Sequence, residues 1–212
     1  MDMDTGGISC CFDRQSQRMY ERYEKRGLSN TAVGIADSVG DSGLDGATVL
    51  EIGCGFGALA LELVRRGASA AVGMDLSPKM VRLASRLASE KGLSDRASFR
   101  LGDGATSVLP MAEIVVLDAV LCCYPDMRAL VVNSSSAAQK CYAISVPDDN
   151  RLATKVLRLL LPLQGVVLHR TNFRFFIHRT RFINEVLQSK GFRLTSSSPA
   201  GLFWSILVFS RG

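Results

Sequence analysis

Glycines and carboxylates occur together at three points in the first half of the chain. Residues 51–57 read Glu-Ile-Gly-Cys-Gly-Phe-Gly, residues 73–75 read Gly-Met-Asp, and residues 102–104 read Gly-Asp-Gly. A glycine-rich turn lets the backbone approach a ligand closely, and carboxylates accept hydrogen bonds from hydroxyl and amino groups. These residue types predict a site for a ligand that contains ribose and adenine.

The glycine spacing alone leaves the ligand open. Gly53, Gly55 and Ala58 also fit the pattern G-x-G-x-x-A, which is typical of proteins that bind nicotinamide dinucleotides. Glycines at such a turn can also serve only to make the turn tight. The choice between these interpretations depends on the elements that flank the glycines.

Strand and helix patterns alternate along the chain. Short apolar, β-branched runs predict strands at 48–52, 70–74, 97–101, 113–117, 141–146, 192–196 and 203–209. Capping residues and apolar periodicity predict helices at 12–26, 30–39, 59–66, 78–91, 125–140, 151–161 and 183–190. This alternation favours an α/β fold, a Rossmann-like doubly wound sheet of seven strands with helices on both faces. The last two strands are too close for a crossover and predict an antiparallel hairpin.

This order of elements brings four carboxylates to one edge of the sheet. Glu51 lies in the first strand, and Asp75, Asp103 and Asp118 stand at the ends of the next three. Ligands of open parallel sheets bind outside the carboxyl ends of the strands. Asp75 is therefore expected to accept from the ribose hydroxyls and Asp103 from the adenine amino group.

From about Leu44 onward the chain resembles class I S-adenosylmethionine-dependent methyltransferases. The family's first motif, E/D-x-G-x-G-x-G, matches residues 51–57, and its later acids fall on Asp75, Asp103 and Asp118. The acid ahead of the glycines separates this family from most dehydrogenases. The resemblance implies S-adenosylmethionine as the cofactor. The residues it implies as cofactor contacts are Glu51, Gly53, Cys54, Gly55, Gly57, Asp75, Leu76, Asp103, Gly104, Asp118, Ala119 and Tyr20.

The resemblance names the reaction but not the methyl acceptor. Residues 118–126 read Asp-Ala-Val-Leu-Cys-Cys-Tyr-Pro-Asp and lack the Asn/Asp-Pro-Pro-Tyr/Phe and Pro-Cys motifs of DNA-modifying relatives. We therefore expect a small-molecule acceptor and no DNA. Within the superfamily the sequence is similar to magnesium-protoporphyrin O-methyltransferases, through Tyr124-Pro125, residues 176–178 (Phe-Ile-His) and Gly191-Phe192. We treat these enzymes as an analogue.

The charge distribution predicts an anionic acceptor. The chain has 25 Lys and Arg residues and 20 Asp and Glu residues, yet Glu185 is the only acid after Asn150. Guanidinium groups suit carboxylates and phosphates, so we expect Arg174 and Arg179, with Tyr23 and Cys123, to bind the acceptor. The expected catalytic residues are His178, Tyr124, Cys122 and Cys123. Both a packed histidine and a merely solvated arginine face remain open interpretations.

The segment at 169–181, which contains both histidines, is expected to form a lid over the acceptor. The Leu-rich run at 152–163 is expected to pack as a lid helix, with contact to an anionic membrane as the alternative. Two Cys-Cys pairs, at 10–11 and 122–123, predict inert thiols, with a soft-metal or thiol-substrate site as the alternative. The pairs lack zinc-knuckle spacing, and no metal site is expected.

Length and composition predict a single domain over residues 1–212. We expect cap helices over 1–43, a cofactor-binding half over 44–147, and a lid and substrate half over 148–212. The acidic start of the chain is unlike a secretory signal, so a cytoplasmic protein is expected. The oligomeric state is not predicted. The alternative functions are a non-catalytic S-adenosylmethionine-binding module and an RNA methyltransferase.

Overall fold

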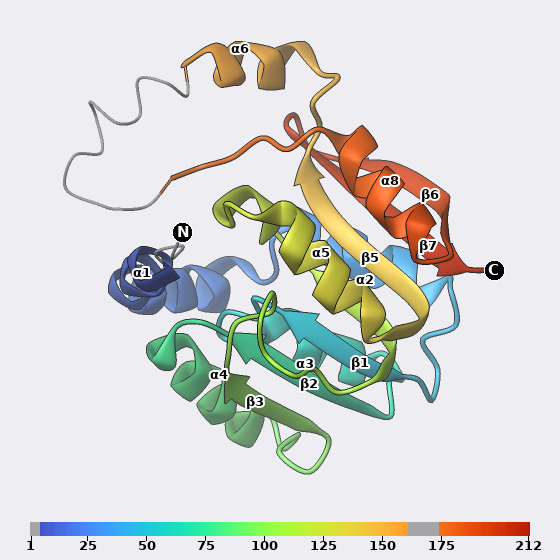
Figure 1. Cartoon of the computed structure of the whole chain (residues 1–212). Helices are drawn as coiled ribbons and strands as arrows, with labels where there is room; N and C mark the ends of the chain where they lie inside the picture. Colours follow the sequence, from blue (N-terminus) through green and yellow to red (C-terminus); the bar gives the residue numbers. More distant parts are fainter. Residues whose placement is uncertain (1–4, 161–173) are drawn as a thin grey trace.

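The computed structural model describes residues 5–160 and 174–212 and contains one seven-stranded sheet (Figure 1). The strand order is β3-β2-β1-β4-β5-β7-β6, in which the first five strands of the chain are parallel and β7 lies antiparallel between β5 and β6. The strands are β1 (Thr48–Ile52), β2 (Ala70–Asp75), β3 (Ala97–Leu101), β4 (Ala112–Leu117), β5 (Ala138–Pro147), β6 (Phe192–Ala200) and β7 (Trp204–Arg211). The predicted fold class, including the closing hairpin, is confirmed.

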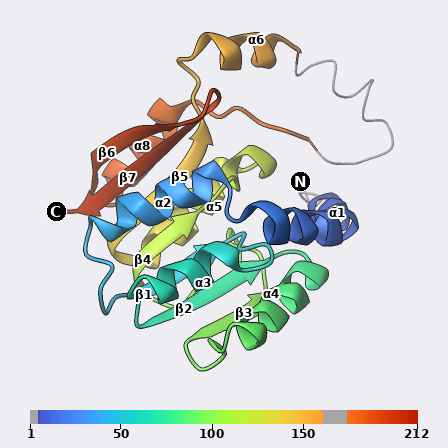
Figure 2. The ribbon, with the colours of Figure 1, turned by 180° about the vertical axis from the view of Figure 1, so that it is seen from behind.

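Helices cover both faces of the sheet. Those of the described residues are α1 (Thr5–Arg26), α2 (Asn30–Gly40), α3 (Ala58–Arg65), α4 (Pro78–Glu90), α5 (Met127–Ser136), α6 (Leu152–Leu160) and α8 (Thr180–Ser189), with a 3-10 turn η1 (Leu121–Cys123). Helices α5 and α8 pack on one face, and α2 and α3 pack on the other (Figures 1 and 2). Helix α1 packs beside α4.

The two-residue period of the strands divides the core into two layers. In β1, Leu50 and Ile52 join the layer under α5 and α8, whereas Val49 joins the layer under α2 and α3. In β4, Leu117 and Val116 alternate in the same way. Successive side chains of a strand point to opposite faces, so a continuous apolar run is what a sheet covered on both sides requires.

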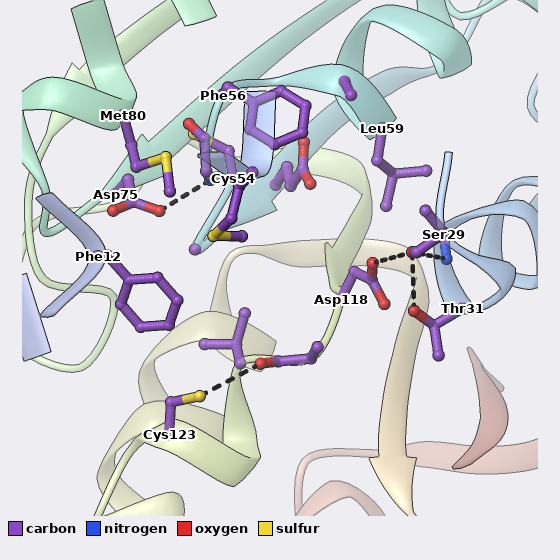
Figure 3. A pocket seen from close by; sticks show the side chains of 18 of the residues that line it. Phe12, Ser29, Thr31, Cys54, Phe56, Leu59, Asp75, Met80, Asp118 and Cys123 are labelled. Atoms are coloured by element: carbon purple, nitrogen blue, oxygen red, sulfur yellow. Dashed lines mark hydrogen bonds between the residues drawn. The ribbon is translucent and has the colours of Figure 1, made fainter. Parts of the chain in front are cut away.

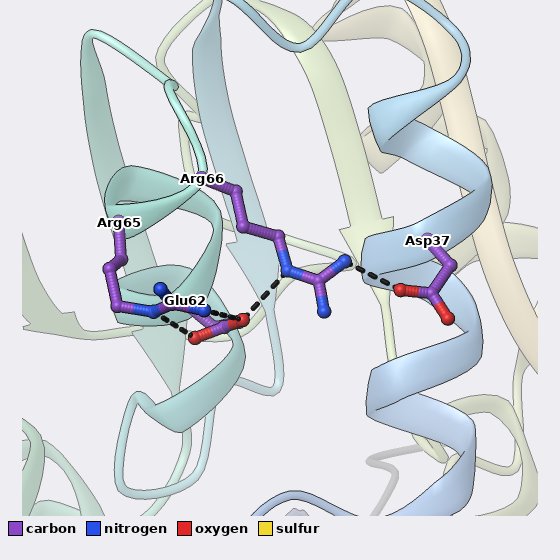
Figure 4. A network of polar contacts seen from close by, with 4 residues as sticks. All are labelled: Asp37, Glu62, Arg65 and Arg66. Atoms are coloured by element: carbon purple, nitrogen blue, oxygen red, sulfur yellow. Dashed lines mark hydrogen bonds and ion pairs between the residues drawn. The ribbon is translucent and has the colours of Figure 1, made fainter.

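An arginine joins the two helices on the second face (Figure 4). The Nε of Arg66, at the end of α3, lies 2.7 Å from the carboxylate of Glu62, and its Nη1 lies 2.6 Å from that of Asp37 in α2. Arg65 also binds Glu62, and these guanidinium groups lower the pKa of Glu62 to about 2. The network fixes α2, whose first turn reaches the edge where the parallel strands end.

One predicted boundary is wrong. The helix expected at 125–140 occupies only Met127–Ser136, and Ala138–Lys140 begin β5 instead. The serines at the end of α5 bind carbonyls of the preceding turn through their hydroxyls, as Ser136 does with Val132 at 2.8 Å. Ala138 then pairs with Ala112 of β4. Pairing with the neighbouring strand therefore overrides the helical propensity of these residues.

Other elements are longer than predicted. Helix α1 begins at Thr5 rather than at residue 12, and β6 continues through Pro199 to Ala200, where a turn was expected. Strand β6 is the edge of the sheet, and proline is tolerated on edge strands because one side of the strand makes no ladder hydrogen bonds. The real turn is the short segment between Ala200 and Trp204.

Helix α6 does not form the expected lid. It stands away from the sheet in both views, and Leu152, Val156 and Leu159 are exposed on it (Figures 1 and 2). The expectations for residues 161–163 and 169–173 lie outside the described residues. In the part of the chain that the structure describes, no helix is long and apolar enough to cross a membrane.

We predict that two glycines of the β1–α3 turn differ in their cost of substitution. Gly55 and Gly57 both have positive φ, but a Cβ at Gly55 meets nothing within 4 Å, whereas one at Gly57 lies 2.6 Å from the ring of Phe99. Gly55→Ala should cost about 1–2 kcal/mol of unfolding free energy for the left-handed backbone alone. Gly57→Ala should cost at least about 1 kcal/mol more, because the ring of Phe99 in β3 must also move to make room for the methyl group. Urea denaturation of both variants checks this, and equal losses would contradict it.

Candidate active site

A cavity of about 870 Å³ opens at the edge where the parallel strands end (Figure 3). Its size falls in the range of about 300–1,000 Å³ that is usual for small-molecule and cofactor sites. The wall is formed by the β1–α3 turn, the ends of β2, β3 and β4, one face of α1, the start of α2, and the turn between β6 and β7. The β1–α3 turn and the ends of β2, β3 and β4 converge there because these strands are parallel and end at one edge of the sheet.

Backbone hydrogen bonds hold the glycine turn in place. The N–H groups of Gly53 and Cys54 donate to the carbonyl of Met74 in β2, at 2.7 and 3.0 Å. The N–H of Gly55 donates to a carboxylate oxygen of Asp75 at 2.8 Å. Gly53 and Gly55 have φ of 66° and 53°, in the left-handed region that favours glycine. Strand β2, which ends in Asp75, therefore fixes the shape of the glycine turn.

Glu51 is buried beneath this turn. The residue is 3% exposed, and its carboxylate accepts a hydrogen bond from the N–H of Ala60, in the first turn of α3, at 2.9 Å. Burial raises the pKa of Glu51 well above its usual value, and the nearby charges of Asp118 and Asp75 raise it further. The helix N-terminus partly offsets this cost because its N–H groups and dipole favour an anion.

Asp75 serves two elements at once. One carboxylate oxygen accepts from Gly55, and the other accepts from the N–H of Ser77 at 2.8 Å, just before α4. Burial raises the pKa of Asp75, and these two backbone hydrogen bonds oppose that rise. A carboxylate has about four acceptor positions, so Asp75 can still bind hydroxyl groups that enter the cavity.

Asp103 is linked to Tyr124, and Tyr124 to His178. The Tyr124 hydroxyl lies 2.9 and 3.0 Å from the two carboxylate oxygens of Asp103. Burial, and then the hydrogen bond to Asp103, raise the pKa of Tyr124. The His178 Nε2 lies 3.0 Å from the backbone carbonyl of Tyr124, and burial lowers the pKa of His178. A neutral ring donates in this contact. His178 therefore holds the loop that carries Tyr124.

Asp118 is fixed by hydroxyl groups from two other elements. Ser145 of β5 donates to one carboxylate oxygen at 2.6 Å. Ser29, the N-cap of α2, donates to the other at 3.3 Å (Figure 3). Burial raises the pKa of Asp118, and these hydrogen bonds oppose that rise. Ser145 also accepts from the N–H of Ala119 at 2.7 Å. Ala119 has φ of 55°, so this serine supports a strained turn in the cavity wall.

The vicinal cysteines differ in access to the cavity. Cys123 lines it, whereas Cys122 is 3% exposed and does not. Their sulfur atoms are 3.4 Å apart, and both thiols point to the carbonyl of Ala119. The hydrogen bond from Cys123 and burial raise the pKa of Cys122 well above its usual value, so its thiolate is disfavoured. No group of three or more potential metal ligands occurs among the described residues, and Cys10 and Cys11 do not join this pair.

The structure brings most of the expected site residues to the cavity. Those that line it are Glu51, Gly53, Cys54, Gly55, Asp75, Leu76, Asp103, Gly104, Asp118, Ala119, Tyr23, Cys123 and Tyr124.

The structure places the other expected residues outside the cavity wall, each for a physical reason. Tyr20 is buried against Phe56, with its hydroxyl on Glu90. Gly57 lies against Phe99, and Cys122 and His178 make the contacts described above. Arg174 and Arg179 are exposed. Tyr20, Gly57, Cys122, His178, Arg174 and Arg179 therefore do not line the cavity, and a role for them in binding or catalysis stays a prediction.

Part of the cavity wall was not predicted from the sequence. Beside the expected Tyr23, one face of α1 contributes Ile8, Phe12, Met19, Arg22 and Arg26. Their three- and four-residue spacing is the signal that could have found them, because such residues share one face of a helix. The β6–β7 turn, which contributes Leu202 and Phe203, could not have been found without knowing that β7 runs back beside β5.

Three comparisons with known proteins bear on this site. Residues 49–148 match a family model described as a methyltransferase domain. The solved structure of a magnesium protoporphyrin IX methyltransferase from Synechocystis PCC 6803 with bound SAH has a TM-score of 0.78 and 24% identity, covering 99% of this chain and 100% of that one. An O-methyltransferase family 2 protein from Planctomyces limnophilus has a TM-score of 0.67 and 16% identity, and the match covers 94% of this chain and 62% of that one. At these identities the solved structures show a shared fold.

A curated relative, ribosomal protein L11 methyltransferase from Enterobacter sp. (strain 638), is 34% identical over 73 residues. The match covers 34% of this chain and only 25% of the relative's length. It therefore concerns a segment rather than the whole protein.

We predict that the buried Glu51 makes stability fall as pH rises. Its folded-state pKa is raised, so the folded protein retains a proton that the unfolded chain has lost. The free energy of unfolding should therefore decrease above the usual glutamate pKa until the folded-state pKa is passed. Glu51→Gln should remove this part of the decrease, up to about 1.4 kcal/mol per pH unit. Urea denaturation from pH 4 to pH 8 measures it.

The matched control is Glu62→Gln. The pKa of Glu62 is lowered, so its contribution has the opposite sign and is present above its unfolded value and lost at lower pH. A Glu51→Gln variant with the unchanged pH dependence of the parent would contradict the prediction.

Proposed function

We propose that this protein transfers a methyl group from S-adenosylmethionine to a small, anionic acceptor. The proposal is supported by residues 49–148, which match a family model described as a methyltransferase domain. The acceptor atom is an oxygen or a sulfur, and the transfer is a direct displacement. The observation that carries the proposal is the convergence of Glu51, Asp75, Asp103 and Asp118 on one cavity around a glycine turn.

The residues of the cavity fit this cofactor. Asp75 would accept from the ribose hydroxyls, and Asp103, oriented by Tyr124, from the adenine amino group. Gly55 leaves open space where any other residue would place a Cβ, so the backbone can approach the ligand. The sulfonium and ammonium groups of S-adenosylmethionine are cationic. Glu51 and Asp118 line the cavity, and a cationic group bound beside them would favour the ionised carboxylates that burial disfavours.

The bound cofactor supplies a methyl group already activated as a sulfonium. The chain's own residues need to align the acceptor and keep water out, because positioning is the main contribution to such a displacement. The carbon–sulfur bond breaks as the carbon–oxygen or new carbon–sulfur bond forms, and an acceptor proton leaves to solvent or to a base. Among the candidates from the sequence, Tyr124 and Cys123 line the cavity.

The relatives support the small-molecule class over the alternatives. The structures of the protoporphyrin methyltransferase and of the O-methyltransferase family 2 protein resemble nearly the whole chain, whereas the relative named for a ribosomal protein matches 73 residues of it. We also propose one domain over 1–212, in which 1–43 cap the cofactor, 44–147 bind it, and 148–212 complete the acceptor side. A non-catalytic binding module remains the alternative that turnover must test.

We predict that the protein binds S-adenosylmethionine and does not bind NAD. Asp75→Ala should weaken S-adenosylmethionine binding by about 1.5–3 kcal/mol, the range for hydrogen bonds to a charged group. Isothermal titration calorimetry measures both ligands. Asp95→Ala is the matched control, because Asp95 is an exposed carboxylate before β3, away from the carboxyl edge, and should leave affinity unchanged. Preference for NAD, or equal affinity of Asp75→Ala and the parent, would overturn the cofactor assignment.

We predict turnover with at least one member of a panel of carboxylate, phenol, thiol and porphyrin acceptors. The product to measure is S-adenosylhomocysteine, which forms once per methyl group transferred. Anionic members should react faster than their neutral analogues. Tight cofactor binding without any product, including with a metabolite extract, would favour the non-catalytic module. Salt-sensitive binding of RNA with methylation would favour the RNA alternative.

A further inference from the structure

Two arginines of α1 face the cavity. Arg22 and Arg26 lie one helical turn apart on the face of α1 that also carries Met19, and they are the only cationic side chains among the described residues that line the cavity. The four carboxylates of the wall all come from the strand ends. The cavity is therefore divided by charge, with its acids on the sheet and its cations on α1.

No described residue pairs with these two guanidinium groups. The ion pairs of the described residues use Arg65, Arg66, Arg86, Lys140 and Arg151. Neither Arg22 nor Arg26 makes a side-chain hydrogen bond within the described part of the chain, and like charges four residues apart on a helix repel each other. An anion between them would relieve this repulsion and satisfy fork-shaped donors that otherwise face water.

The turn between β6 and β7 adds an apolar part to the same cavity. Leu202 is 76% exposed and Phe203 is 40% exposed, although both are large apolar side chains. Exposed apolar groups at a cavity wall are typical of a surface that a ligand covers. A ligand that satisfies both features has an apolar body and an anionic group.

The position of the anionic group follows from the charges. Placed among Glu51, Asp75 and Asp118, it would add a negative charge to carboxylates whose ionised forms are already disfavoured by burial. On the α1 side the anionic group would lie beside the guanidinium groups of Arg22 and Arg26. The exposed Arg174 and Arg179, which the sequence suggested for this role, do not line the cavity.

We propose that Arg22 and Arg26 bind the anionic group of the methyl acceptor, an organic acid whose apolar body lies against Leu202 and Phe203. This inference rests on the proposed function, because it assigns the acceptor side of the same cavity. Helix α1 thus selects the acceptor, while the strand ends bind the cofactor.

The test uses a fluorescent aromatic acid, 8-anilinonaphthalene-1-sulfonate, and its uncharged analogue N-phenyl-1-naphthylamine. Both are titrated into the full-length protein saturated with S-adenosylhomocysteine. Arg22→Gln/Arg26→Gln should weaken binding of the sulfonate about tenfold or more, because charge-assisted hydrogen bonds are lost. Binding of the neutral analogue should change less than about twofold, since it depends on the apolar wall.

The matched control is Arg14→Gln/Arg18→Gln. These arginines have the same spacing on the same helix and are exposed, but neither lines the cavity, so sulfonate binding should stay as in the parent. Arg22→Lys/Arg26→Lys, which keeps the charge, should recover part of the affinity. Equal loss in both glutamine variants, or no loss in Arg22→Gln/Arg26→Gln, would overturn the inference.

Calorimetry with S-adenosylhomocysteine separates this inference from the proposed function. All the variants should bind it with parental affinity, which also shows that they are folded. If the parent itself binds no S-adenosylhomocysteine, the proposed function fails. If it binds and the sulfonate titrations are insensitive to Arg22 and Arg26, only the assignment of the acceptor fails.

Discussion

The binding of buried carboxylates by backbone N–H groups is the interaction on which the rest of the cavity depends. Glu51 accepts from Ala60 in α3, and Asp75 accepts from Gly55 in the glycine turn and from Ser77 before α4. Each acid lies in a strand, so each hydrogen bond ties a helix or a turn to the sheet. Burial raises the free energy of the ionised carboxylates, and the N–H groups at a helix N-terminus lower it again. A cationic ligand in the cavity would lower it further.

A second set of contacts supports the opposite wall. The hydroxyl of Tyr124 orients the carboxylate of Asp103, and His178 holds the backbone of Tyr124 from outside the cavity. The N–H of Phe176 also binds the carbonyl of Cys122, so the segment that leads into α8 rests on the loop after β4. In this arrangement the histidine supports the loop that carries Tyr124.

The charges that line the cavity are consistent with the two ligands of the proposed function. Acids line the strand ends, where a cationic cofactor would be favoured, and α1 supplies arginines where an anionic acceptor would be favoured. The two ligands of the proposed reaction have opposite charge, so each side of the cavity repels the wrong ligand as well as attracting the right one. The net charge of +5 for the whole chain does not indicate how acids and cations are distributed around the cavity.

The sequence by itself determined the sheet, the glycine turn and the acids at the strand ends. Apolar runs such as 113–117 and a cap such as Ser29 depend on local periodicity and on local hydrogen bonds, which one segment contains in full. Only the tertiary structure decided which side chains reach the cavity. His178 turns to a carbonyl, Tyr20 turns to Glu90, and Arg22 faces the cavity while Arg174 does not. Ala138–Lys140 became strand because β4 lies beside them. These outcomes depend on partners distant in the chain, and a local pattern does not record where those partners lie.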